Sequence, residues 1–518
     1  MPEDALTAPV PPVLTPQHLP GRSLAAFVAE FGFECRGVLD GIDITGITLN
    51  SNEVQVGDLF VGVRGANSHG ADFLAQAKDR GAVAFLTDQE GAAIATGCDL
   101  PIVVVDSPRG VLGAAAAWVY QTSDDLLPLL FGVTGTNGKT STTYLLEAIL
   151  KQLGLVTGMS STAERHIGDL TFVSRLTTPE SSELHALLAR MRESGVQAAA
   201  IEVSAQALSQ CRIDGLVFDV VAFTNLSHDH LDDYANMEEY FAAKLALFDP
   251  EHARRGVVSL DSDWGQHLVE RSRIPVTTVS ATPGVVGDWN VQILREHFAY
   301  TAFRLTAPDG ASLTTCEPVI GRHMAANAAL AIVMLVEAGF EFTRIADALR
   351  DGISAYLPGR TERVSGETGP SVYVDFGHSA DAFLKTLTAV RTVTPGNVIM
   401  VFGADGDRDA TKRHEMGRVA SEWSDILVIT DHHPRFEDPA SIRATLIEGA
   451  HLAEHEAELY EVGSPEQAIR RAVSLAGPGD AILWAGPGHQ DYRDIRGVRT
   501  RYSARAEARA ALDEVGWV

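Results

Sequence analysis

The sequence of 518 residues contains only four cysteines, and no two of them form a C-x-x-C pair: Cys35, Cys98, Cys211 and Cys316. This spacing indicates neither a disulfide framework nor a cysteine zinc site, and it is typical of a reducing cytoplasm. The sequence also lacks an apolar run of the roughly 20 residues that a transmembrane helix needs. We therefore expect a cytoplasmic protein without membrane insertion.

Basic residues are scarce as well. The 41 lysines and arginines are outnumbered by 68 aspartates and glutamates, which gives a formal net charge of −27. An acidic surface repels the phosphate backbone of nucleic acids and anionic membranes, so neither is expected as a partner. A small phosphorylated ligand is not excluded, because a local site can oppose the overall charge.

The length predicts roughly three domains, and the sequence divides into three blocks after a leader. Residues 1–20 are rich in proline and lack the basic region of a signal peptide, which predicts a disordered leader. We place the blocks at 21–125, 126–357 and 358–518. Apolar β-branched runs alternate with helical patterns in all three, which indicates an α/β fold. In the third block, long connections between four apolar runs predict parallel strands: 372–376, 398–403, 426–430 and 481–486.

A glycine-rich loop opens the second block between an apolar strand at 129–133 and a helical pattern from Lys139 to about Leu153. Glycines allow backbone N–H groups to surround phosphate oxygens, a helix N-terminus adds partial positive charge, and a lysine neutralises the β- and γ-phosphates. The hydroxyl of Thr140 is placed to reach Mg²⁺. The candidate nucleotide-binding residues are Gly132, Thr134, Gly135, Thr136, Asn137, Gly138, Lys139, Thr140 and Ser141.

The segment from Thr134 to Thr140 resembles the ATP loop of the Mur ligase family, and the resemblance extends over nearly the whole chain after the leader. It is nearest to the members that add the third residue to UDP-N-acetylmuramoyl-L-alanyl-D-glutamate. The resemblance implies three domains: a UDP-sugar-binding domain, a P-loop ATP-binding domain and a Rossmann-like amino-acid-binding domain. It also implies a monomeric, cytoplasmic, ATP-dependent ligase of peptidoglycan precursor synthesis, and thus of cell-wall biogenesis, cell shape and cell division.

A second cation site is indicated near this loop. Glu202 ends the apolar strand at 198–203, and a polar run that includes His230 follows the strand at 217–225. A buried carboxylate at a strand end needs a partner, and Mg²⁺ would supply one. The resemblance makes Glu202 and His230 metal ligands. Lys244, on the apolar face of a helix, then becomes a carbamate formed with CO₂ that binds Mg²⁺; without the resemblance it would be a snorkelling lysine.

The resemblance assigns further contacts to ATP and to the UDP-sugar dipeptide. Asn327, inside an alanine-rich helix, would contact adenine; Arg360 would reach the γ-phosphate; and Asp375 would lie near the ribose or phosphates. Without the family, the first-block segments read as polar turns, and capping alone explains Thr178 as the N-cap of a helix with Pro179 at its first position. The residues implied for the UDP-sugar dipeptide are Leu49, Ser51, Ala66, Asn67, Ser68, Thr177, Thr178, Ser204, Gln210 and Arg212.

Polar loops follow all four strands of the third block, and in a doubly wound sheet such loops share one edge. Arg408 and Arg435 in these loops favour an anionic or zwitterionic ligand. In relatives that select meso-diaminopimelate, an Asn stands at the position of His433 and a Glu at that of Gln490. The loop residues Arg408, His433, Arg435, Gly486 and Gln490 are therefore candidates for the amino-acid site. They leave diaminopimelate, lysine, ornithine, diaminobutyrate and homoserine open.

The implied reaction is phosphorylation of the D-glutamyl carboxylate by ATP, followed by attack of an amine on the acyl phosphate. Lys139, Arg360 and two Mg²⁺ ions would stabilise the transferring phosphoryl group, with Lys244 and His230 supporting the second ion. Two alternatives remain. One is a ligase like folylpolyglutamate synthetase, which lacks a UDP-binding domain. The other is a nucleotide-binding switch without catalysis, which needs no arginine-bearing pocket in the third block.

Overall fold

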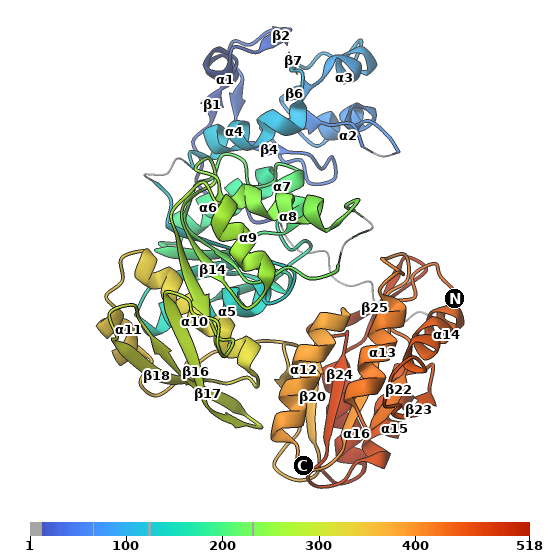
Figure 1. Cartoon of the computed structure of the whole chain (residues 1–518). Coiled ribbons are helices and arrows are strands. Elements are labelled where there is room, and N and C mark those ends of the chain that lie inside the picture. The colour runs from blue at the N-terminus through green and yellow to red at the C-terminus, as the bar shows by residue number, and fades with distance from the viewer. Residues whose placement is uncertain (1–12, 66, 123–125, 230, 232, 518) are drawn as a thin grey trace.

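The computed structural model describes residues 13–65, 67–122, 126–229, 231 and 233–517, and it contains three large sheets that follow one another along the chain. Figure 1 shows the N-terminal sheet at the top, the central sheet below it and the C-terminal sheet beside the central one. No helix in these ranges is long and apolar enough to cross a membrane. The backbone N–H groups of Gln17 and His18 donate hydrogen bonds to Glu193 at the end of a helix of the central domain, so the chain already contacts that domain before residue 21.

The N-terminal sheet has the order β2-β7-β6-β5-β4, in which β4 to β7 are parallel and β2 is antiparallel. Helices α1 and α4 cover one face, and η1, α2 and α3 cover the other. The elements are β1 (Arg22–Ser23), α1 (Leu24–Phe31), β2 (Glu34–Arg36), β3 (Asp43–Ile44), β4 (Gly46–Thr48), β5 (Asp58–Gly62), η1 (Gly70–Phe73), α2 (Leu74–Asp79), β6 (Ala84–Thr87), α3 (Gln89–Ile94), β7 (Ile102–Val104) and α4 (Pro108–Tyr120).

The central sheet has eleven strands in the order β11-β10-β9-β12-β8-β13-β14-β15-β16-β17-β18. Its parallel part consists of β9, β12, β8, β13, β14, β15 and β16 and carries the loops discussed below. Antiparallel strands extend the sheet at both ends. Helices α5 and α10 lie on one face, and α6, α8 and α9 lie on the other.

The strands of the central sheet are β8 (Leu129–Thr134), β9 (Thr157–Ser160), β10 (Glu164–Ile167), β11 (Leu170–Val173), β12 (Ala198–Glu202), β13 (Phe218–Phe223), β14 (Ala253–Ser259), β15 (Val276–Ser280), β16 (Trp289–His297), β17 (Tyr300–Thr306) and β18 (Ser312–Glu317). Its helices are α5 (Lys139–Gln152), α6 (Ser181–Glu193), α7 (Ala205–Ser209), α8 (Met237–Leu245), η3 (Ala246–Phe248), α9 (Asp263–Arg271), α10 (Arg322–Glu337) and α11 (Phe342–Ala348).

The C-terminal sheet has the order β19-β20-β24-β21-β22-β23, and its five strands from β20 to β23 are parallel. Helices α12 to α14 cover one face, while α15 and α16 cover the other. The elements are β19 (Glu362–Arg363), β20 (Ser371–Asp375), α12 (Ala380–Val393), β21 (Val398–Phe402), α13 (Arg413–Trp423), β22 (Ile426–Ile429), α14 (Pro439–Ala450), β23 (Glu458–Glu461), α15 (Pro465–Leu475), β24 (Ala481–Ala485), β25 (Tyr492–Ile495), β26 (Val498–Arg501) and α16 (Ala504–Glu514).

The expected α/β fold is confirmed, and each predicted parallel strand of the third block is present within a residue or two of its expected bounds. The sequence patterns did not reveal the antiparallel strands β16 to β18, whose outer residues are exposed, or the edge strand β23.

Candidate active site

The glycine-rich loop joins β8 to α5, and two of its glycines have no room for a side chain. Gly135 has a φ of +146°, and a Cβ there would lie 1.9 Å from the Thr224 hydroxyl oxygen. Gly138 has a φ of +86°, and its Cβ would lie 2.7 Å from Oδ1 of Asn327 in α10. Gly132 is the third predicted glycine; it belongs to β8 itself, and a Cβ there would lie 3.0 Å from the Phe218 ring.

Hydrogen bonds from the end of β13 hold the loop in shape. Asn225 Oδ1 accepts a bond from the Asn137 backbone N–H at 3.0 Å, and its amide nitrogen donates to the Asn137 carbonyl at 3.0 Å. Thr224 donates to the same carbonyl at 2.6 Å, and the Thr136 N–H donates to the Asn225 carbonyl at 2.9 Å. The loop is therefore fixed before any ligand binds, which is the preorganisation that phosphate binding requires.

Two lysines meet at one backbone carbonyl of this loop. Nζ of Lys139 donates to the carbonyl oxygens of Gly135 at 3.0 Å and Thr136 at 2.9 Å, and Nζ of Lys244 donates to Gly135 at 2.9 Å. Burial lowers the pKa of Lys139, although Glu202 and Asp229 oppose this. Burial and the neighbouring Lys139 lower the pKa of Lys244 well below its usual value. The arrangement favours an uncharged amine at Lys244, which is only 1% exposed.

The Glu202 carboxylate is fully buried at the end of β12, within a small network of hydroxyl groups. It accepts bonds from the backbone N–H and the hydroxyl group of Thr162, at 3.1 and 2.9 Å, and Thr162 contacts the Thr177 hydroxyl at 3.0 Å. Thr162 was missed because it lies in an irregular turn after β9 without a recognisable motif. The second predicted ligand, His230, lies outside the described residues.

Thr178 does not cap a helix, so that prediction is wrong. Helix α6 begins at Ser181, with Glu180 as its N-cap residue. The Thr178 hydroxyl instead donates to the Glu202 carbonyl at 2.8 Å and accepts from the Ser204 N–H at 3.0 Å. Without Thr178, these two backbone groups at the end of β12 would lose this hydrogen-bond partner. Pairing them stabilises the fold more than capping a helix locally would.

A guanidinium group reaches the loop from the C-terminal domain. Arg360 donates from Nη2 to the Thr140 hydroxyl at 2.7 Å, and its guanidinium carbon lies 4.2 Å from the centroid of the Phe376 ring. The Asp375 carboxylate positions this segment, because it accepts bonds from the Thr361 N–H at 2.8 Å and the Gly377 N–H at 2.7 Å.

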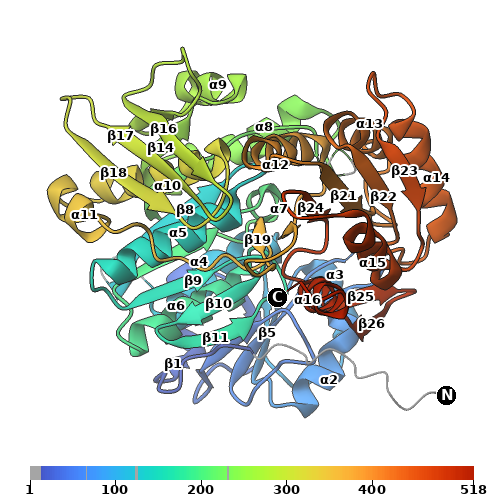
Figure 2. The same cartoon turned by 90° about the horizontal axis from the view of Figure 1, so that it is seen from below.

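Two further contacts cross from the central to the C-terminal domain beside the loop. Asn137 donates to the Asp381 carboxylate at 3.0 Å, and Lys412 Nζ lies 2.9 Å from Asp229 Oδ1. Figure 2 shows the C-terminal domain, which includes α12 and α13, beside the central domain. The sequence analysis missed Asp381 and Lys412, since their importance depends on how the domains pack.

A pocket of about 390 Å³ lies between the N-terminal and central domains. Leu49 and Ser51 line it, together with Gln76, which accepts a bond from the Ser51 hydroxyl at 3.0 Å. Arg212 lies 3.0 Å from Glu180 on the opposite wall and donates to Gln210 at 2.7 Å. Asn67 and Ser68 lie in an exposed turn, Ser204 caps α7, and Ala66 lies outside the described residues.

The polar loops of the C-terminal domain meet at one edge of its sheet, as expected. His433 accepts a bond at Nδ1 from the Asp494 N–H (3.0 Å), so its Nε2–H donates to Gln490 Oε1 at 2.9 Å. Arg435 lies 3.3 Å from the Asp405 carboxylate. Gly486 has a φ of +111° at the end of β24, and Arg408 is exposed to solvent.

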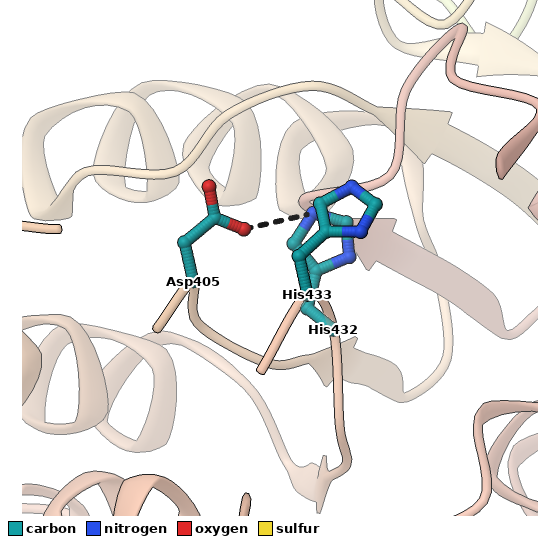
Figure 3. A group of neighbouring side chains, drawn as sticks. All are labelled: Asp405, His432 and His433. Carbon is teal, nitrogen blue, oxygen red and sulfur yellow. Dashed lines mark ion pairs between the residues drawn. The ribbon is translucent and has the colours of Figure 1, made fainter. Parts of the chain in front are cut away.

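Asp405, His432 and His433 form one group in the described part of the chain whose ligand atoms all lie within 4.8 Å (Figure 3). Both ring nitrogens of His433 are already hydrogen-bonded. Arg435 also places a positive charge 3.3 Å from the same carboxylate. The chemistry of this group therefore fits a hydrogen-bonded pocket better than a metal centre.

These features define a ligase: a phosphate loop in a parallel sheet, with an arginine and a polar pocket on a separate C-terminal sheet. The chain belongs to the Mur ligase family. The Mur ligase family catalytic domain matches residues 43–120, the Mur ligase middle domain matches 133–335, and the glutamate ligase domain matches 359–488.

Relatives agree over the full length. The chain is 59% identical to a UDP-N-acetylmuramyl-tripeptide synthetase of Leifsonia xyli, with 99% of this chain and 100% of the relative covered. It is 41% identical to a UDP-N-acetylmuramoyl-L-alanyl-D-glutamate–2,6-diaminopimelate ligase of Streptomyces avermitilis, covering 98% and 99%. A solved structure of a ligase of that second name superposes with a TM-score of 0.66 at 25% identity, covering 96% of this chain and 99% of the other.

Proposed function

We propose that this Mur ligase uses ATP to join the third amino acid to UDP-N-acetylmuramoyl-L-alanyl-D-glutamate in the cytoplasm. The observation that carries the proposal is the convergence of Lys139, Thr140 and Arg360 on one phosphate loop, beside a fully buried Glu202. A switch that only binds nucleotide would need neither an arginine delivered from a second domain nor a polar pocket beyond it.

The triphosphate would lie along the loop from Thr134 to Ser141, where backbone N–H groups and the start of α5 supply positive potential. Lys139 would release the Gly135 and Thr136 carbonyls and bind the β- and γ-phosphates. Asn327 would contact the adenine, and Asp375 would hold the segment that presents Arg360. Because these groups are fixed before the reaction, they stabilise charge on the moving phosphoryl group without reorganisation.

Two magnesium ions fit the donor set, with Thr140 at one and Glu202, His230 and carbamylated Lys244 at the other. Glu202 supports the fit, because this fully buried carboxylate accepts hydrogen bonds from Thr162 and also interacts electrostatically with Lys139 and Arg360, two groups that would bind phosphate. Lys244 supports it as well, since the amine must be uncharged to add CO₂ and burial favours that form. When bound, the ions neutralise charge on the phosphates.

The protein's part in the reaction is to position substrates and exclude water. The UDP-sugar would occupy the pocket beside Leu49 and Ser51, and we assign further contacts with it to Ala66, Asn67 and Ser68. Thr177, Thr178, Ser204, Gln210 and Arg212 would direct the D-glutamyl carboxylate towards the loop. Phosphorylation gives an acyl phosphate, the α-amine of the third amino acid attacks its carbonyl carbon, and inorganic phosphate leaves.

The amino acid would bind at the edge of the C-terminal sheet beside Arg408, His433, Arg435, Gly486 and Gln490. We assign the UDP-sugar, ATP and amino-acid functions to domains spanning 21–125, 126–357 and 358–518, with the protein acting as a monomer. The names of the relatives differ in the amino acid that they specify, so the test must vary it.

The test measures phosphate release with ATP, Mg²⁺, the UDP-dipeptide and a panel of amino acids. We expect release only when all components are present, together with a UDP-tripeptide of the corresponding mass. Nucleotide binding without release for any amino acid would contradict the ligase proposal and support a switch. Release with a folate substrate in place of the UDP-dipeptide would support the folylpolyglutamate-synthetase alternative.

A further inference from the structure

The polar pocket at the edge of the C-terminal sheet contains a carboxylate, Asp405, that adds a negative charge beside Arg435. Asp405, in the loop after β21, lies 3.3 Å from Nη2 of Arg435 through its Oδ2. Its Oδ1 has no hydrogen-bond partner among the described residues and lies 3.5 Å from Nε2 of His432. Figure 3 shows the carboxylate pointing toward the two imidazole rings. The side chain as a whole is 32% exposed, although Oδ1 itself is shielded from solvent, so a solute can approach the carboxylate but not Oδ1 directly.

The carboxylate is charged while the rings beside it are not. Burial opposes ionisation of Asp405, but its surroundings outweigh burial and lower its pKa, and Arg435 is the neighbour among them that carries a positive charge at neutral pH. Burial lowers the pKa of His432 to about 3 and also lowers that of His433. At neutral pH the local charges are therefore the Arg435 cation and the Asp405 anion, which offset one another.

The remaining polar groups are occupied. Gln490 Oε1 accepts from His433, and the Gln490 amide nitrogen lies 3.4 Å from the Tyr492 hydroxyl. Arg493 approaches from the neighbouring hairpin, but it donates to the His432 carbonyl at 3.3 Å. The distal carboxylate of an entering amino acid would share the single Arg435 guanidinium with Asp405. The two negative charges would then lie close together and repel each other. A hydrogen-bond donor, such as an ammonium or hydroxyl group, would instead be attracted by the Asp405 anion.

On the basis of the proposed function, we infer that Asp405 determines specificity: it excludes third amino acids with a distal carboxylate and favours side chains that end in a hydrogen-bond donor, an ammonium or a hydroxyl group. The substrate class is thus a diamino acid with one carboxylate, or a hydroxy amino acid, and not diaminopimelate. Arg435 acts through its pairing with Asp405, and Gln490 accommodates the donor without adding charge.

The test uses ligands that differ by one group. meso-Diaminopimelate is lysine with a second carboxylate, norleucine is lysine without its ammonium, and norvaline is the corresponding control for ornithine and homoserine. We expect the wild-type kcat/KM for the best of lysine, ornithine, diaminobutyrate and homoserine to exceed that for diaminopimelate by at least tenfold. We expect norleucine and norvaline to be poorer than their donor-bearing counterparts.

The ratio to follow is kcat/KM for the best of these four amino acids divided by kcat/KM for diaminopimelate. Asp405→Asn should lower this ratio by tenfold or more, whereas Asp405→Glu, which keeps the charge, should maintain it. Asp407→Asn makes the same charge change two residues along the loop and should leave the ranking unchanged. Thermal unfolding verifies that each variant folds. Wild-type use of diaminopimelate equal to that of lysine, or an unchanged ratio in folded Asp405→Asn, would overturn the inference while leaving the ligase proposal intact. No activity with any amino acid would instead contradict the ligase proposal.

Discussion

At the residue scale, the Gly135 carbonyl links two lysines that lie 105 positions apart in the chain. The sequence identified both lysines for separate reasons, Lys139 by its loop and Lys244 by its place on an apolar helical face. It could not show that both amines donate to one oxygen, because that contact depends on how α8 packs beside β8. The same limit applies to Asp405, which reads from sequence as a loop aspartate.

The first prediction concerns Lys139. Lys139→Ala should lower turnover by at least a hundredfold, because no other group replaces its charge on the β- and γ-phosphates. The measurement is phosphate release under saturating substrates. Lys151→Ala, on the exposed face of the same helix, is the control and should remain active. Near-normal turnover by folded Lys139→Ala would rule out the loop as the phosphate site.

The second prediction concerns Lys244. Lys244→Ala should be nearly inactive, and short carboxylates such as acetate should partly restore the rate by replacing the carbamate oxygens. The measurement is turnover against acetate concentration, with chloride at equal ionic strength as the control. A full Mg²⁺-dependent rate without acetate would show that Lys244 is an ordinary packed lysine.

At the element scale, patterns of buried apolar residues predicted most parallel strands well, since β8, β12, β13, β20, β21, β22 and β24 are almost wholly buried. Short or half-exposed strands such as β10 and β11 gave little signal. Helix starts were less predictable where a capping residue had a stronger long-range role, as Thr178 does.

In the central domain a charged network joins α5 to β10: His166 lies between Glu147 at 2.8 Å and Glu164 at 3.3 Å.

The third prediction is a pH dependence of stability from this network. Burial opposes protonation of His166, but the two glutamates outweigh it and raise its pKa from 6.5 to about 9. A raised folded-state pKa stabilises the fold below pH 6.5, and this contribution is lost as the pH rises towards 9. The unfolding free energy should therefore fall across this window. His166→Gln should show a shallower fall in chemical denaturation, and an equal slope in both proteins would contradict the prediction.

At the scale of the whole molecule, the C-terminal domain contacts the phosphate loop through three polar contacts that come from separate segments. They join Arg360 to Thr140, Asp381 to Asn137 and Lys412 to Asp229. Each partner is unremarkable in sequence, because the contacts exist only after two independently folded sheets have docked. This is why the sequence could predict Arg360 only through the family resemblance.

The fourth prediction concerns docking of that domain. The Lys412–Asp229 pair is largely shielded, with side-chain exposures of 14% and 7%. Breaking such a charge-assisted contact costs roughly 1–3 kcal/mol, so Lys412→Ala should shift the balance between closed and open domains by about tenfold. Small-angle scattering should show a larger radius of gyration, and kcat should fall. Arg418→Ala removes ion pairs within α13 itself and should change neither.

The hydrogen bond from Arg360 to the Thr140 hydroxyl competes with the Mg²⁺–ATP complex, because we assign the same hydroxyl group to Mg²⁺. A guanidinium at 2.7 Å from the hydroxyl oxygen disfavours a divalent ion there, so binding of a metal–nucleotide complex is an exchange of one cation for another. The apparent dissociation constant then equals the intrinsic one divided by the fraction of molecules in which the arginine has withdrawn. Because Asp375 holds the segment next to Arg360 through two hydrogen bonds from Thr361, we expect substitutions of these two residues to change that fraction and hence the affinity for ATP.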